Sequence, residues 1–184
     1  MTRVLVDADV FAYSCGAAVQ KTLYDCAAQL PDGSIDEAIQ PTAGDRDAWL
    51  ASGFPEGTEF SVTPVVDADP EHFAIFLVKR ALSAIEKAMD HAGIQYGNLE
   101  LFLTGKGNFR ETLATIKGYK ANRISRERPV HYKAIRRYLR RAWGAQTCAG
   151  IEADDRLATL AHSLDYDPER VLIVSMDKDL MTVP

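Results

Sequence analysis

Short apolar runs alternate with longer stretches of helical periodicity along much of this chain. Residues 3–6, 99–103 and 171–174 form compact apolar runs that are typical of buried strands. Helical patterns extend from the first strand to about residue 20, cover most of 108–142 with a break near Arg128 and Pro129, and return at 152–164. This alternation predicts an α/β fold with a mostly parallel central sheet and helices on both faces.

A long helix is expected to begin at Asp69-Pro70-Glu71. Asp69 suits the N-cap, Pro70 suits the first turn, and Gly93 suits the end of the helix. The positions expected to face the core are Phe73, Phe76, Leu77, Ala81, Ala84, Ile85 and Ala88. By contrast, residues 24–69 are predicted to form an irregular insertion rich in Pro and Gly, which has strand-like patches at 35–40 and 59–66 and contains a hairpin.

Acidic side chains gather where two predicted strands end and where one helix begins. Asp7 and Asp9 follow the first strand, and Asp177 and Asp179 follow the last. The helix from residue 152 starts with three acids, Glu152, Asp154 and Asp155. Functional groups in such folds collect at the carboxyl ends of strands, and Thr104 ends the remaining strand there. Crowded carboxylates raise one another's pKa unless a cation lies among them, and oxygen ligands suit Mg²⁺ or Mn²⁺.

Each acidic pair also has an ordinary explanation. First-turn acids interact favourably with the helix dipole, and a polar exit from a strand is common. Asp67 and Asp69 repeat the spacing but precede a helix away from the strands, so we leave them out of the predicted site.

The net charge of −5 conceals a strong asymmetry. Residues 106–141 carry 12 Lys and Arg against two acids, a local charge of +10, whereas the remainder carries 9 against 24. One predicted helical face in this segment is cationic, formed by Lys133, Arg136, Arg137, Arg140 and Arg141. Upstream, residues 118–123 combine cations with Tyr119, an aromatic suited to stacking on a base. A basic segment beside an acidic centre favours a polyanionic substrate.

The remaining features narrow the class of protein. The longest apolar run, residues 73–78, is far shorter than the ~20 residues that span a bilayer. The first strand runs straight into Asp7, which does not fit the apolar core of a signal peptide. Cys15, Cys26 and Cys148 are odd in number and widely spaced, as expected of buried thiols in a reducing cytosol.

Together these motifs resemble the 5′-nuclease (flap endonuclease) family, which includes the 5′→3′ exonuclease domain of bacterial DNA polymerase I and bacteriophage 5′→3′ exonucleases. The specific part is Gly150-Ile-Glu-Ala-Asp-Asp-Arg-Leu-Ala158 followed by Val174-Ser-Met-Asp-Lys-Asp-Leu180. Weaker matches are Val4-Leu-Val-Asp7, Asn108-Phe-Arg110 and Tyr119-Lys-Ala-Asn-Arg123. The resemblance implies a PIN-like fold with a basic helical arch at about 106–142, all within one catalytic domain of residues 1–184.

The resemblance also implies a site for two Mg²⁺ or Mn²⁺ ions and no small-molecule cofactor. Asp7, Glu152 and Asp154 would hold one ion, while Asp177 and Asp179, with Asp154 or Asp155, would hold the second. Lys120 and Arg123 would contact the scissile phosphate, and Arg110 and the cationic face would guide the strand. The implied substrate is DNA with a 5′ end or flap, or the RNA of an RNA–DNA hybrid. The protein would act as a monomer, away from membranes, in the cytoplasm (the host's if phage-encoded), in phage replication or host-genome degradation.

Two departures from the family pattern stand out. Thr104 occupies the strand end where the family usually has a metal-binding Asp, so either metal affinity falls or Asp9 compensates. The family's further acidic ligand and Gly-rich helix–hairpin–helix do not follow Asp179, so the chain is expected to be a fragment. Two alternatives therefore stay open. One is a haloacid-dehalogenase-type phosphatase that uses Asp7 and Asp9; the other is a non-catalytic nucleic-acid-binding relative.

Overall fold

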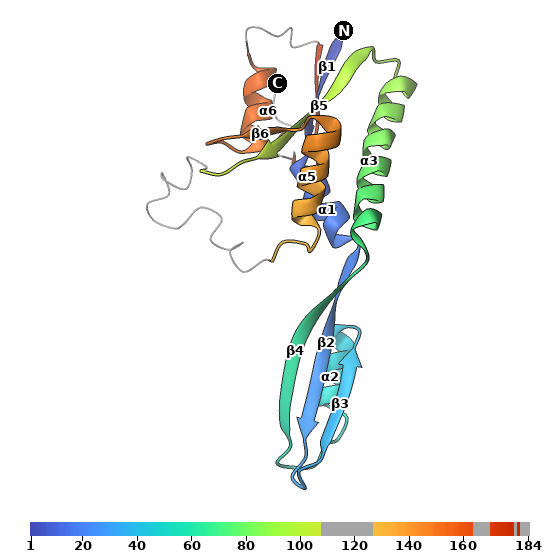
Figure 1. Ribbon diagram of the computed structural model, residues 1–184, viewed down its shortest axis with the longest axis vertical. Helices are drawn as coiled ribbons and strands as arrows, with labels where there is room; N and C mark the ends of the chain where they lie inside the picture. Colours follow the sequence, from blue (N-terminus) through green and yellow to red (C-terminus); the bar gives the residue numbers. More distant parts are fainter. Residues whose placement is uncertain (108–126, 164–169, 179, 181–184) are drawn as a thin grey trace. The chain divides into compact units, whose positions relative to one another are not determined.

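The computed structural model describes residues 1–107, 127–163, 170–178 and 180, and its elements are labelled in Figure 1. Contacts divide the chain into two compact units. The larger unit comprises Met1–Ala18 and Pro70–Pro184, and the inserted unit is Val19–Asp69. The predicted arch residues 108–126, which include Arg110, Tyr119, Lys120 and Arg123, lie outside the described residues.

A four-stranded parallel sheet forms the centre of the larger unit. β1 (Thr2–Asp7) pairs with β5 (Tyr96–Thr104) on one side and with β7 (Val171–Val174) on the other. β6 (Gln146–Cys148) pairs with β5, so the order is β6-β5-β1-β7. The prediction of an α/β fold with a parallel sheet between helices is confirmed.

Helices cover both faces of this sheet (Figure 1). On one face, Leu5 and Phe102 pack against α6 (Ala153–Ala161) through Leu157 and Leu160. Because side chains alternate along a strand, the fully buried Val4 and Val6 point to the other face. That face is covered by α1 (Asp9–Ala17), α3 (Glu71–His91) and α5 (Tyr132–Trp143), which contact one another.

The long helix α3 differs from the prediction in its N-cap residue and in the face that it buries. Pro70, not Asp69, occupies the N-cap position, and Gly93 follows the helix with a φ of 68°, as expected of a terminating glycine. The buried stripe is Ala74, Val78 and Leu82. The stripe predicted from residue 73 was wrong: Phe73, Phe76, Ala84 and Ala88 are exposed, and Leu77, Ala81 and Ile85 are only partly buried. The apolar residues of α3 extend over more than one side, so periodicity alone did not identify the packed one. None of the helices within the described ranges is long and apolar enough to cross a bilayer.

The inserted unit is a three-stranded antiparallel sheet of order β3-β2-β4 with one helix. The elements are β2 (Gln20–Gln29), β3 (Ile35–Gln40), α2 (Ala43–Leu50) and β4 (Glu59–Ala68). The patch at 35–40 is confirmed as β3, while β4 runs two residues beyond the predicted patch. β2 and α2 were not predicted, and α1 ends at Ala17 because Gln20 already belongs to β2.

A small core of its own holds the inserted unit together. Cys26 and Ala28 of β2 are fully buried, and the Arg46 guanidinium of α2 lies 4.7 Å from the Tyr24 ring centre. Trp49 and Phe60 meet edge to face with ring centres 6.1 Å apart. The three cysteines of the chain are free and buried, as the sequence indicated.

Candidate functional site

The parallel sheet brings the predicted acidic segments to one edge. β1, β5 and β7 run in the same direction, so Asp7, Thr104 and the residues after Val174 all lie at the carboxyl ends of strands. The register pairs Asp7 with Phe102 and Val6 with Val174. This is the edge at which ligands bind in open α/β sheets.

Asp7 is the best-defined acid at this edge. Its Oδ1 accepts a hydrogen bond from the Asp9 N–H at 3.1 Å, and its Oδ2 accepts one from the Ser175 hydroxyl at 3.2 Å. Burial, together with the neighbouring carboxylates of Asp9 and Asp154, raises the pKa of Asp7 to about 6, despite the lowering effect of the two hydrogen bonds. A buried carboxyl with acidic neighbours is stabilised in its charged form by a nearby cation.

The segment after β7 is joined to Asp7 through Ser175. The Asp177 N–H donates to Ser175 Oγ at 3.0 Å, and the same hydroxyl donates to Asp7. Asp177 is exposed, and Asp179 lies outside the described residues. Ser175 was not predicted as a site residue, although its place between a strand and an acidic pair was a usable signal.

The start of α6 supplies the remaining acids. Glu152 occupies the N-cap position in an extended conformation and is only 7% exposed, whereas charged residues are rarely so buried without partners. Asp154 and Asp155 follow in the first turn, and the Asp155 N–H donates to Asp154 Oδ1 at 2.8 Å. Asp154 is close enough to influence the pKa of Asp7, so β1 and α6 present acids to a shared region.

Thr104 ties β5 to the start of α6. Its Oγ1 accepts a hydrogen bond from the Ala153 N–H at 2.9 Å, which satisfies one of the free donors at the start of α6. The Thr104 N–H donates to Asp9 Oδ2 at 2.8 Å. Thr104 therefore caps the acidic helix, and the hydroxyl at this strand end has a structural partner.

The donor chemistry fits a hard divalent cation, since carboxylate and hydroxyl oxygens make up the set. Within the described residues, however, no three Asp, Glu, His or Cys side chains lie close enough together to hold a metal ion. The acids share an edge of the sheet without forming a closed cluster, and the predicted ligand Asp179 lies outside the described residues.

Helix α5 carries the predicted cationic face. Four of its members, Lys133, Arg137, Arg140 and Arg141, are exposed, and Arg137 lies 3.2 Å from Glu71 of α3. Like charges on one helix face are unfavourable unless an anion is present, which suits a phosphate backbone.

Arg136 departs from this face because its side chain turns inward. It forms an ion pair with Asp9, and both side chains are less than one-fifth exposed. The sequence carried a signal for this: Arg136 lies within the buried stripe of Tyr132, Ile135 and Leu139, with spacings of three and four residues. The same contacts argue against Asp9 as a replacement for the missing metal ligand, because both Asp9 oxygens already accept hydrogen bonds from Arg136 and from the Thr104 N–H.

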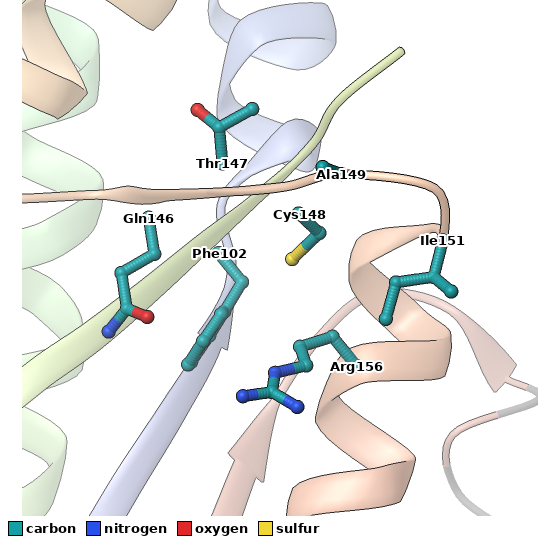
Figure 2. Close-up of a pocket in the computed structure, with 7 residues that line it drawn as sticks. All are labelled: Phe102, Gln146, Thr147, Cys148, Ala149, Ile151 and Arg156. Atoms are coloured by element: carbon teal, nitrogen blue, oxygen red, sulfur yellow. The ribbon is translucent and has the colours of Figure 1, made fainter. Parts of the chain in front are cut away.

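A separate pocket of about 280 Å³ lies between strands β5 and β6 and helix α6. Figure 2 shows Arg156 extending from α6 toward Phe102, with Cys148 between the strand and the helix. Burial raises the pKa of the Cys148 thiol, and the nearby Arg156 lowers it. None of the predicted site residues lines this pocket.

Comparison with known proteins gives one partial match. Over 84 residues the chain is 37% identical to the 5'-3' exonuclease of Buchnera aphidicola subsp. Schizaphis graminum (strain Sg). The aligned stretch covers 44% of this chain and 29% of that protein, so the chain spans less than a third of the relative's length. No family model and no solved structure matches the chain. The match supports a nuclease function in general.

Proposed function

We propose that this chain is a divalent-metal-dependent nuclease that hydrolyses phosphodiester bonds of DNA at or near a 5′ end. The observation that carries the proposal is the convergence of Asp7, Asp154 and the Ser175–Asp177 segment at the carboxyl edge of a parallel sheet. The partial likeness to a protein named 5'-3' exonuclease supports the same reaction class. The fold is compatible with a PIN-like nuclease.

The residues divide the work according to their chemistry. Asp7, Glu152 and Asp154 are assigned to one cation, and Asp177 and Asp179, with Asp154 or Asp155, to a second. This assignment requires the described acids to move closer together around the ion than they lie in this structure. Two such cations supply an activated water and stabilise the leaving oxygen of the phosphodiester. Ser175 orients the Asp7 carboxylate through its hydroxyl, and Thr104 fixes the start of α6, so the acids keep their mutual positions.

The basic residues would bind and orient the substrate. The exposed Lys133, Arg137, Arg140 and Arg141 of α5 suit the phosphates of a single strand or 5′ flap. Lys120 and Arg123, with Arg110 and Tyr119, are proposed to contact the strand near the scissile phosphate, where cations stabilise developing charge.

The phosphatase alternative fits this structure less well. That mechanism requires the Asp9 carboxyl to face the substrate, whereas its two oxygens are engaged by the Arg136 guanidinium and the Thr104 N–H. The non-catalytic alternative would show salt-sensitive DNA binding without cleavage.

The test is cleavage of a 5′-labelled DNA with a single-stranded 5′ flap in Mg²⁺, in Mn²⁺ and in EDTA. The Asp154→Asn variant is compared with Asp47→Asn, a matched change at an exposed position in the inserted unit. We expect short 5′ products that disappear in EDTA and in Asp154→Asn but persist in Asp47→Asn. DNA binding with no product under any metal condition would refute the nuclease assignment.

A further inference from the structure

The inward position of Arg136 distinguishes it from the other cations of α5. Its side chain is 16% exposed, whereas that of Arg137, its neighbour in sequence, is 54% exposed. A guanidinium withdrawn from solvent in this way is poorly placed to bind the phosphates of a strand. Its role has to be read from the groups that surround it.

The Arg136 guanidinium joins α5 to α1 through Asp9 and to β5 through Thr104, and it also contacts Tyr132 of its own helix. Nη1 donates to Asp9 Oδ1 and, at 3.2 Å, to the Tyr132 hydroxyl; Nη2 donates to the Thr104 carbonyl at 2.5 Å. The guanidinium carbon also lies 5.4 Å from the centre of the Tyr132 ring. This forked arrangement uses the geometry of arginine, which the single ammonium of lysine does not reproduce.

Asp9 is held equally firmly. Oδ1 receives Arg136, and Oδ2 receives the Thr104 N–H at 2.8 Å. At the same time the Asp9 N–H donates to Asp7, the central acid of the candidate site. The Asp9 carboxylate is therefore two positions along the chain from a proposed metal ligand, yet both its oxygens point to partners on β5 and α5.

We propose that Arg136 is a positioning residue that keeps the Asp9 carboxylate out of the metal site. This inference rests on the proposed function, because it concerns the cation that Asp7 and Asp154 would hold. Without Arg136, Asp9 is an additional oxygen donor and an uncompensated negative charge beside Asp7. Cations would then bind more tightly but in the wrong place, and turnover would fall while DNA binding persisted.

The experiment compares Arg136→Gln, Asp9→Asn and the double variant in the full chain. Mn²⁺ affinity is measured by calorimetry without DNA, and kcat and KM are measured on the flap substrate. We expect Arg136→Gln to bind Mn²⁺ about tenfold more tightly and to lose about tenfold in kcat, with KM for DNA unchanged within about twofold. Adding Asp9→Asn removes the uncompensated charge, so the double variant should return to near wild-type Mn²⁺ affinity.

The matched control is Arg137→Gln, one position along the same helix. It is expected to raise KM for DNA and to leave Mn²⁺ affinity unchanged. If Arg136→Gln behaves like Arg137→Gln, or if adding Asp9→Asn does not reverse the change in Mn²⁺ affinity, Arg136 does not position Asp9.

If Arg136→Gln does not fold, the same measurements on Arg136→Lys decide, since lysine keeps the charge and loses the forked guanidinium. A wild-type chain that binds Mn²⁺ and cleaves while Arg136→Gln is unaltered refutes this inference alone. A wild-type chain that neither binds Mn²⁺ nor cleaves refutes the proposed function as well.

Discussion

Replacing Asp7 by asparagine is expected to stabilise the metal-free protein at neutral pH. The pKa of Asp7 rises from 3.8 to about 6 chiefly because the carboxyl is buried. Each pKa unit corresponds to about 1.4 kcal/mol, so ionising Asp7 in the folded state costs about 3 kcal/mol. Asparagine has nearly the same shape and accepts the Asp9 N–H without carrying charge.

Because the pKa of Asp7 is higher in the folded state than in the unfolded state, its effect on stability depends on pH. Below about pH 4 Asp7 is protonated in both the folded and unfolded states, so its raised pKa costs nothing there. Between about pH 4 and pH 6 the unfolded state ionises Asp7 while the folded state keeps it protonated, so the wild type loses stability relative to the variant, and above about pH 6 this loss is complete. The expected difference in the free energy of unfolding is less than about 1 kcal/mol at pH 4 and about 3 kcal/mol at pH 8.

The assay is urea unfolding in EDTA at both pH values, with Asp177→Asn as the control. Asp177 is exposed at the same edge, so its replacement should give no gain that grows with pH. Adding Mg²⁺ should stabilise the wild type and leave Asp7→Asn unchanged, because the cation offsets the cost of the buried charge. If Asp7→Asn is no more stable than the wild type at pH 8, the inference that ionised Asp7 destabilises the metal-free folded state is wrong.

Three further outcomes are expected. Thr104→Val removes the acceptor for the Ala153 N–H and should lower the free energy of unfolding by about 1–2 kcal/mol in urea, whereas Thr104→Ser should stay within about 0.5 kcal/mol; equal losses in both would contradict the capping role. A Cβ at Gly105 would lie 2.1 Å from the Cys148 carbonyl oxygen, so Gly105→Ala should cost more than about 2 kcal/mol in the same measurement. Gly97→Ala, in β5 with nothing within 4 Å of its Cβ, is the control and should change stability by less than about 0.5 kcal/mol. Neutralising Arg140 or Arg141 to Gln should reduce the slope of log affinity for DNA against log salt by about 1 in a salt titration, while Lys21→Gln in the inserted unit leaves it unchanged; an unaltered slope would remove α5 from the DNA interface.

Three strands of the central sheet, β1, β5 and β7, could be predicted from the sequence because each is a short apolar run, as is typical of strands in a parallel sheet covered by helices. The fourth, β6, was not predicted, because its three residues, Gln146–Cys148, are not an apolar run. β2 of the inserted unit was not predicted either. Its only buried residues are the small Cys26 and Ala28, and its pairing with β4 joins segments far apart in the sequence, which a local pattern does not reveal.

The candidate site was predictable in outline and not in its internal contacts. Acids at strand ends are visible in sequence, and topology brings Asp7 near Asp154. The pairing of charged groups depends on neighbours from other elements. Arg136, for example, was predicted on the cationic face of α5 but forms an ion pair with Asp9 of α1. Helical periodicity predicted only approximately where the Arg136 side chain points. Its partner, Asp9, lies more than a hundred residues away in the chain.

The order in which the sheet is built along the chain has a consequence for biosynthesis. β1 is made first, but its partners β5 and β7 come much later, so that Arg3 pairs with Val171. The strands of the inserted unit pair with segments nearer in the sequence, so this unit can fold before β1 has its partners, because closing shorter loops costs less entropy. The acids of β1, α6 and the segment after β7 meet only once the last strand has docked. Under the proposed function, a growing chain would lack the complete acidic edge until synthesis had passed β7.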